Sequence, residues 1–235
     1  MDSNAFQRWN SDLANVIAHV GDPIFFQQVF AAIEAQVPVA YPQAWLYHKD
    51  LPPQLLDHKI PKDAYDSQVD EYLEGPYRED PFFKISLSAP RNNCYRLSRL
   101  VTGDFEQSSY HKNYYASTGT VDEAIIVTRL TDGSVINISL MRLLNQGEFS
   151  EDEYNWLYSV SQCLAELIDL HTRREEFVES NDDDDDDNDD VDDDEINAPA
   201  EEPMLRKMVP HDDDHAHSDD DVAGDDDAYD DDDDE

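Results

Sequence analysis

The chain has 235 residues, of which 56 are acidic and 16 are basic, so its formal net charge is −40. Residues 181–235 carry 29 of the acidic side chains and only two basic ones, Arg206 and Lys207. Such a charge repels nucleic-acid phosphates and argues against direct binding to DNA or RNA. Residues 1–180 have an ordinary globular composition and suffice for one domain, whereas residues 181–235 have little to bury and are predicted to form a disordered Asp-rich tail.

Cellular location is indicated by what the sequence lacks. The N-terminal stretch MDSNAFQRWNSDL has no basic start followed by an apolar run, so a signal peptide is not expected. No stretch approaches the ~20 apolar residues that a membrane-spanning helix needs. The two cysteines, Cys94 and Cys163, occur without a CxxC pair and indicate reduced thiols. These features predict a cytoplasmic protein without membrane contact.

The first third of the chain predicts helices followed by strands. In residues 5–20 apolar side chains recur at spacings of three and four, which is typical of an amphipathic helix. Gly21 ends this helix, and Asp22 followed by Pro23 predicts the cap and first position of a second helix. The next predicted elements are two strands and a helix, at residues 44–48, 55–59 and 62–74.

An aromatic junction, YLEGPYREDPFF, follows at residues 72–83. Asp80 precedes Pro81, which favours an extended backbone at Asp80 and places its carboxylate to cap the next helix. The alternative is that Asp80 accepts a hydrogen bond from a ligand N–H in a cavity lined by Tyr72, Tyr77 and Phe82, because ligand sites are mostly apolar with a few placed polar groups. We favour the capping role, and the two roles are compatible.

The second half of the domain predicts a sheet closed by a long helix. Residues 94–100 are predicted as a strand and residues 104–117 as a helix that Gly119 ends. The runs AIIVTRL and SVINISLM flank the turn TDG, which predicts a β-hairpin with Gly133 at positive φ. Within SVINISLM the residues alternate between two faces, Ile136, Ile138 and Leu140 on one and Val135, Asn137 and Ser139 on the other.

The last predicted helix has the clearest start signal in the chain. Ser150 is expected as the N-cap and Glu153 completes a capping box, while Phe149 and Tyr154 are spaced to form a hydrophobic staple. The apolar stripe then continues to about Phe177. Helices at both ends around an antiparallel sheet predict an α+β domain.

Signatures of catalysis and metal binding do not stand out. The histidines follow no ligand spacing such as HExxH, and no GxSxG motif or phosphate-binding glycine loop occurs. We therefore expect neither an enzyme nor a bound cofactor or metal ion.

Within the acidic tail, residues 203–210 (PMLRKMVP) form an apolar and basic island. One interpretation is a chance break in a low-complexity segment. The other is a short partner-docking helix. The apolar face of this helix would consist of Met204, Leu205, Met208 and Val209, with Arg206 and Lys207 beside them.

Residues 5–178 resemble the N-terminal sensory domain of LuxR-type helix-turn-helix transcriptional regulators. The resemblance is carried, in order, by YLEGPYREDPFF, CYRLSRLVTGDFEQSSYHKNYYASTGTVDE, GSVINISLMR and FSEDE. It implies a GAF/PAS-like α-β-α sandwich with a central antiparallel sheet, usually dimeric. It also implies that Asp80 holds a ligand N–H, with Tyr72 and Tyr77 as pocket aromatics and Trp45 and Tyr47 on the sheet beneath. From the residues themselves we add Phe82 and the inward-facing Tyr110 to this expected pocket.

The resemblance stops where such regulators carry their DNA-binding helix-turn-helix, because the acidic tail stands there instead. Our leading hypothesis is a non-enzymatic regulatory protein that forms a homodimer or pairs with a LuxR-type regulator. Its tail would bind a basic protein as a nucleic-acid mimic, since long-range attraction raises encounter rates with basic surfaces. The alternative hypothesis is a small-molecule sensor whose tail serves solubility.

Overall fold

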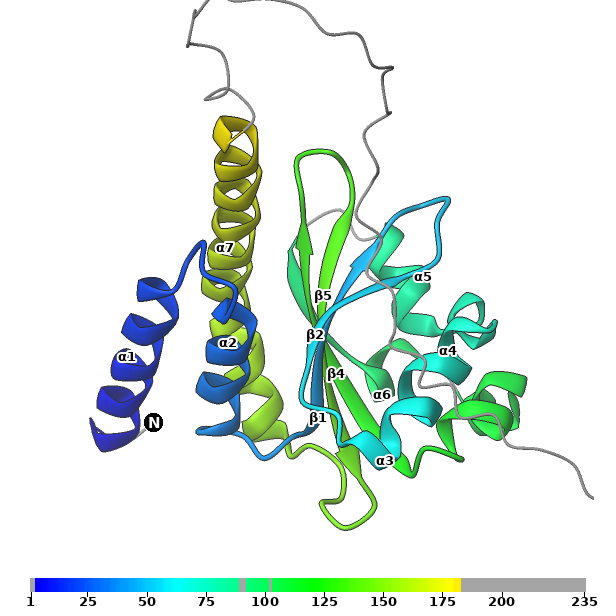
Figure 1. Cartoon of the computed structure of the whole chain (residues 1–235). Helices are drawn as coiled ribbons and strands as arrows, with labels where there is room; N and C mark the ends of the chain where they lie inside the picture. The colour runs from blue at the N-terminus through cyan, green and yellow to red at the C-terminus, as the bar shows by residue number, and fades with distance from the viewer. Residues whose placement is uncertain (1–2, 89–91, 102, 183–235) are drawn as a thin grey trace, which may run out of the picture. The chain divides into compact units, whose positions relative to one another are not determined.

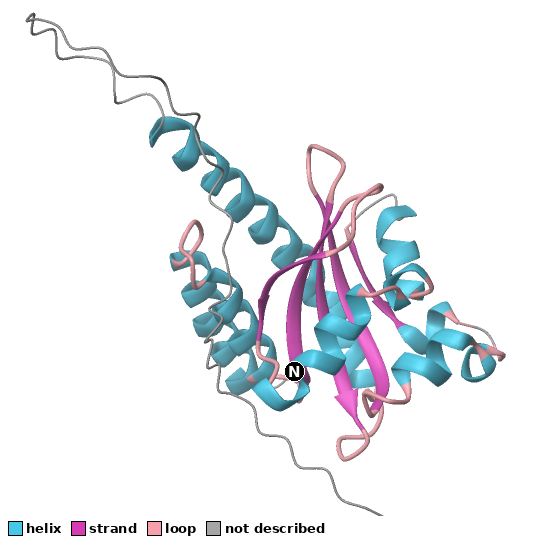
Figure 2. Cartoon of the chain, turned by 45° about the vertical axis from the view of Figure 1, so that its right-hand side comes forward, coloured by secondary structure: helices cyan, strands magenta, loops and turns pink. Residues whose placement is uncertain are grey.

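The computed structural model describes residues 3–88, 92–101 and 103–182. Its middle layer is a five-stranded antiparallel sheet in the order β2-β1-β5-β4-β3, drawn in magenta in Figure 2. The strands are β1 (Ala40–Tyr47), β2 (Gln54–His58), β3 (Asn93–Arg96), β4 (Thr120–Arg129) and β5 (Val135–Leu143). The predicted hairpin is present as β4 and β5, with Gly133 at a φ of 89° in its turn.

Two helical layers cover the sheet (Figure 1). On one face lie α1 (Ser3–Ala18), α2 (Phe25–Glu34) and α7 (Glu151–Asp182), with α1 outermost. The other face is covered by short helical segments: α3 (Lys62–Tyr65), η1 (Asp66–Asp70), α4 (Glu71–Leu73), η2 (Pro76–Arg78), α5 (Pro81–Ser88), α6 (Leu97–Leu100), η3 (Phe105–Gln107) and η4 (His111–Tyr115). The predicted α+β class and α-β-α sandwich are confirmed. None of the helices in these described segments is long and apolar enough to cross a membrane.

The central strands are buried on both faces and divide their side chains between two cores. Ile136, Ile138 and Leu140 of β5 pack in the apolar cluster under α2 and α7, as predicted. Val135 belongs to the second cluster, under the short helices, and Asn137 and Ser139 share its face of the strand. One face of the sheet is therefore an apolar core, while the other carries buried polar groups.

The start of α7 matches its prediction. The Ser150 N–H donates to Glu153 Oε2 at 2.7 Å, and the Glu153 N–H donates to Ser150 Oγ at 3.2 Å, which closes the capping box. Phe149 and Tyr154 are both buried in the cluster under α7, as expected of a staple. The local sequence predicts this helix start, and Arg142 adds a hydrogen bond to Glu153 from β5.

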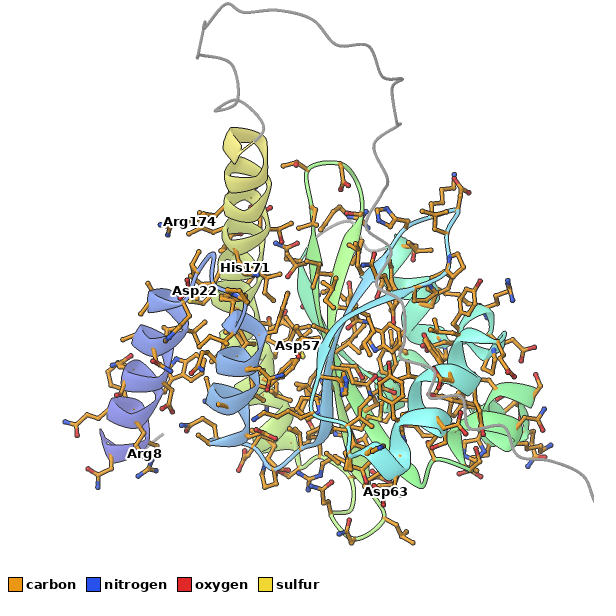
Figure 3. The ribbon with its side chains drawn as sticks, in the orientation of Figure 1. Arg8, Asp22, Asp57, Asp63, His171 and Arg174 are labelled. Atoms are coloured by element: carbon orange, nitrogen blue, oxygen red, sulfur yellow. The ribbon has the colours of Figure 1, made fainter. Side chains whose placement is uncertain are left out.

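The predicted cap of the second helix is wrong. α2 begins at Phe25 with Ile24 at its N-cap, and Asp22 lies in the preceding turn. The turn is instead fixed from α7, because the Gly21 N–H donates to Nδ1 of His171 at 2.9 Å and the His171 ring stacks on Phe25 at 4.1 Å. Figure 3 shows Asp22 and His171 next to each other, where this turn meets α7.

Two predicted elements are broken into shorter ones. The strand at 94–100 ends at Arg96, and residues 97–100 form α6, because Leu97 and Leu100 lie three apart and pack together into the second cluster. The helix at 104–117 is interrupted at Ser108, whose backbone is extended and whose Oγ accepts the His111 N–H at 3.1 Å. The first segment therefore changes structure where it packs into the second cluster, and the second where Ser108 caps a new helical turn.

Candidate functional site

The candidate site lies between the sheet and the layer of short helices. Side chains from both layers meet there and leave a cavity of about 20 Å³, room for about one water molecule. The sheet contributes Gln43, Trp45, Tyr47, Thr120, Glu123, Ser139 and Met141, and the helical layer contributes Gln68, Tyr72, Asp80, Tyr110, Tyr114, Tyr115 and Thr118. The lining side chains therefore fill most of the site themselves.

Asp80 contacts both this cavity and α5, the helix that follows it in the chain. Its Oδ1 accepts the Phe82 N–H at 2.7 Å, so the predicted capping of α5 is confirmed. Its Oδ2 accepts the hydroxyl of Tyr72 at 2.8 Å, and that hydroxyl lies 3.4 Å from the hydroxyl of Tyr47. The carboxylate is only 5% exposed, so both hydrogen bonds act in a buried setting. Asp80 thus caps a helix and faces the cavity at once.

Aromatic rings form most of the cavity wall. The Tyr72 ring lies 5.4 Å from Trp45 and 5.4 Å from Tyr114, and Tyr110 lies 5.5 Å from Tyr114. Five of the seven pocket residues expected from the sequence line the cavity: Trp45, Tyr47, Tyr72, Asp80 and Tyr110. The other two, Tyr77 and Phe82, are buried in the same cluster but do not line the cavity.

Glu123 is the ionisable cavity residue that the sequence analysis did not identify. It lies on β4, is 8% exposed, and its Oε1 accepts the hydroxyl of Ser139 at 2.6 Å. The signal was present in the sequence, because Glu123 shares the alternation of Ile125 and Val127 on a buried strand. The other lining residues that the predicted pocket did not include are Gln43, Gln68, Tyr114, Tyr115, Thr118, Thr120, Ser139 and Met141.

Burial controls the protonation of the two cavity carboxylates. It raises the pKa of Asp80 to about 6, against the opposing hydrogen bonds from Tyr72 and Phe82. It raises the pKa of Glu123 to about 8, and the nearby Asp80 charge pushes in the same direction. Burial also raises the pKa of Tyr72 well above its ordinary value. The cavity therefore disfavours negative charge in the unliganded protein.

Two further polar atoms at the cavity have no hydrogen-bond partner. They are the side-chain oxygen Oε1 of Gln68 and the hydroxyl of Tyr115, both buried. Buried polar groups are almost always paired, because leaving one unpaired costs about 1–3 kcal/mol. Together with the carboxylates, these atoms give the cavity unused capacity for hydrogen bonds, most of it as acceptor.

Within the described ranges, no group of three or more His, Cys, Asp or Glu side chains lies close enough to hold a metal ion. The cavity instead presents carboxylates, an amide oxygen and phenols around aromatic rings. Such a set binds and orients a small molecule through hydrogen bonds and ring contacts. The expected docking residues Met204, Leu205, Arg206, Lys207, Met208 and Val209 lie outside the described residues.

Comparison with known proteins supports the fold. No protein-family model matches the chain, and no curated protein does either. The ligand-binding domain of VqsR from Pseudomonas aeruginosa matches with a TM-score of 0.61 and 20% identity, over 71% of this chain and 97% of that one. CepR2 from Burkholderia cenocepacia, an N-acylhomoserine lactone-dependent LuxR-family transcription factor, matches with a TM-score of 0.52 and 17% identity, over 72% and 97%. The chain has the fold of a LuxR-type ligand-binding domain.

The hydrogen bonds of Asp80 lead to a stability prediction. Asp80→Ala leaves the Phe82 N–H and the Tyr72 hydroxyl unpaired, so we expect the free energy of unfolding to fall by about 2–5 kcal/mol in urea denaturation. Asp80→Asn keeps an amide oxygen for the cap and is expected to lose less than half as much. Equal losses in the two variants would show that the fold requires the charge itself.

The raised pKa of Glu123 predicts a pH dependence of stability. An unfolded chain loses the glutamate proton near pH 4, about the ordinary value, whereas the folded chain keeps it up to about pH 8. Between these values the folded state holds the extra proton, so the free energy of unfolding falls as the pH rises and levels off above about pH 8. We expect Glu123→Gln to become more stable relative to wild type between pH 5 and pH 9.

Urea denaturation at these two pH values measures the effect. The matched control is Glu166→Gln, since Glu166 is an exposed residue of α7. A stability difference between Glu123→Gln and wild type that is the same at both pH values would contradict the assignment.

Proposed function

We propose that this chain is a non-enzymatic regulatory domain that binds a small molecule in the cavity between its sheet and its short helices. One observation carries the proposal: two buried carboxylates and two unpaired polar atoms converge on a single aromatic-lined cavity. Burying such groups costs stability. A ligand that supplies hydrogen-bond partners offsets this cost, so the arrangement makes physical sense as a binding site.

The fold supports the same function by analogy. The VqsR domain is described as a ligand-binding domain, and CepR2 depends on an N-acylhomoserine lactone. We carry over from them only the expectation that the domain binds a small molecule, and the position of the site comes from the cavity of this chain. The identity of a ligand is not carried over, because fold alone does not determine function.

Ligand entry requires the helical layer to move. A cavity of about 20 Å³ is far below the ~300–1,000 Å³ of typical small-molecule sites. The covering layer contains two π-helical turns, η1 and η4, which carry the cavity residues Gln68, Tyr114 and Tyr115. Single π-helical turns are frequent at functional sites. We propose that these turns shift outward when the ligand binds.

Extraction of the purified protein tests the proposal. We expect a small molecule to be released on denaturation and detected by mass spectrometry, and its return to raise the melting temperature of the stripped protein. Asp80→Asn should abolish that rise while the unliganded fold persists. The control is Asp132→Asn, because Asp132 lies in the β4–β5 turn, where it accepts hydrogen bonds from Ser134.

A retained molecule that is indifferent to Asp80→Asn would place binding elsewhere. If the substitution mainly destabilises the unliganded domain, capping of α5 is its whole role.

The interaction hypothesis is a second proposal, and it depends on the acidic residues 181–235. The charge of that segment favours a basic partner, such as the DNA-binding surface of a LuxR-type regulator. Truncation after Ser180 should weaken binding to such a regulator at least tenfold and flatten its salt dependence in a titration. Equal affinity of the truncated and full chains would contradict the hypothesis that the acidic segment acts as a nucleic-acid mimic. The homodimer likewise stays a prediction.

A further inference from the structure

We propose that the ligand of this cavity is a small organic cation, an ammonium compound bound between the carboxylates of Asp80 and Glu123 and enclosed by the aromatic wall. This inference rests on the proposed function and names the chemical class of its ligand.

The cavity buries two carboxyl groups without a cationic side chain among its lining residues. Asp80 and Glu123 are its only ionisable carboxyl groups, and none of its described lining residues is a lysine, arginine or histidine. The groups that donate hydrogen bonds to the two carboxylates are neutral: the Tyr72 phenol, the Phe82 backbone N–H and the Ser139 hydroxyl. Lys84 acts on Asp80 only from outside the lining, and its Nζ donates to the Glu79 carbonyl at the surface.

The adjacent residue on the same strand shows how this protein treats a carboxylate that serves structure. Asp122 points to the opposite face of β4, where its Oδ2 pairs with the Arg96 guanidinium at 2.8 Å. It also accepts the backbone N–H of Phe149. Buried charges are normally paired in this way. Glu123 has no such cation in its cavity, so the missing positive group is one that a ligand supplies.

The aromatic wall suits a cation as well. The faces of aromatic rings carry negative potential, and a cation within about 6 Å of a ring centroid gains about 0.5–2 kcal/mol. Rings from both layers surround the cavity: Trp45, Tyr47, Tyr72, Tyr110, Tyr114 and Tyr115. Aromatic cages are the usual means by which proteins bind organic ammonium groups. An anionic ligand would instead face two carboxylates and several ring faces.

The hydrogen-bonding capacity of the cavity also fits an ammonium group. An ammonium group is a pure donor, with up to three N–H bonds to give. The cavity offers the unpaired Oε1 of Gln68, which only accepts, besides the carboxylates of Asp80 and Glu123. An ammonium group therefore pairs the very atoms that the unliganded protein leaves short of donors.

Cation binding also fits the protonation of the site. A bound ammonium group favours the ionised form of each carboxylate, so it lowers their pKa values and releases protons. Affinity should accordingly rise with pH until both carboxylates are ionised. The titratable groups that face them are Tyr47 from β1, Tyr72 from α4, Tyr110, Tyr114 and Tyr115 around η4, and Asp122 from the far side of β4.

The test compares probes of equal size and different charge on the stripped full-length protein. We would titrate 2-phenylethylamine, 2-phenylethanol and phenylacetate by calorimetry, and then a panel of other primary and quaternary amines with matched alcohols. The amines are expected to bind at least tenfold more tightly than their alcohols, and the carboxylate not at all. The amine advantage should grow between pH 6 and pH 8.5.

Two isosteric variants locate the effect. Glu123→Gln retains an oxygen to accept the Ser139 hydroxyl, and Asp80→Asn retains one for the cap, so both preserve shape. Each should cut the amine preference to less than threefold, whereas Asp132→Asn, outside the cavity, should leave it unchanged.

Tighter binding of alcohols or carboxylates overturns the cation inference but supports a small-molecule site. Absence of binding by every amine also overturns the cation inference. The extraction experiment then shows independently whether the protein binds a small molecule. An amine preference that survives both substitutions places the cation site elsewhere and equally refutes the assignment.

Discussion

The alternation of side chains along β4 and β5 is the constraint on which the rest of the structure depends. These central strands are buried on both faces, so each residue is committed to one of two cores. The pairing of Ile126 with Ile138 and of Ile125 with Ser139 fixes the register. A slip of one residue would exchange the faces, putting Glu123 among the apolar side chains under α7 and Asp122 into the cavity. The position of the cavity carboxylate is thus set by the same pairing that forms the core.

The two faces of the sheet differ in how they treat buried polar groups. The face under α2 and α7 is an apolar core whose one buried acid, Asp122, is matched by Arg96. The face under the short helices buries carboxylates with raised pKa values and leaves Gln68 Oε1 unpaired. Such groups lower the stability of the unliganded state. The apolar face supplies stability that offsets the cost of the polar groups buried on the other face.

Sequence alone predicted those parts in which local chemistry decides the structure. The capping box at Ser150, the hairpin at Gly133 and the cap at Asp80 each depend on residues within a few positions of one another. The prediction failed where contacts with a distant part of the chain determine the local structure. The α1–α2 turn is held by His171, some 150 residues away. Glu123 alternates with Ile125 and Val127, so its face of β4 can be read from the sequence, but the cavity on that face depends on the helices that cover it.

Asp80 and Glu123 differ in what they can reveal about the site. The Asp80 carboxylate both caps α5 and binds Tyr72, so a ligand that engages it acts on the first turn of that helix and on the covering layer. This makes Asp80 suited to pass binding on to the fold, and it also means that substitutions there mix structural and binding effects. Glu123 is anchored to the sheet by one hydroxyl, from Ser139, and caps no helix. A change of charge at Glu123 therefore alters the electrostatics of the cavity with little change in the scaffold, which makes this residue the cleaner measure of what the cavity binds.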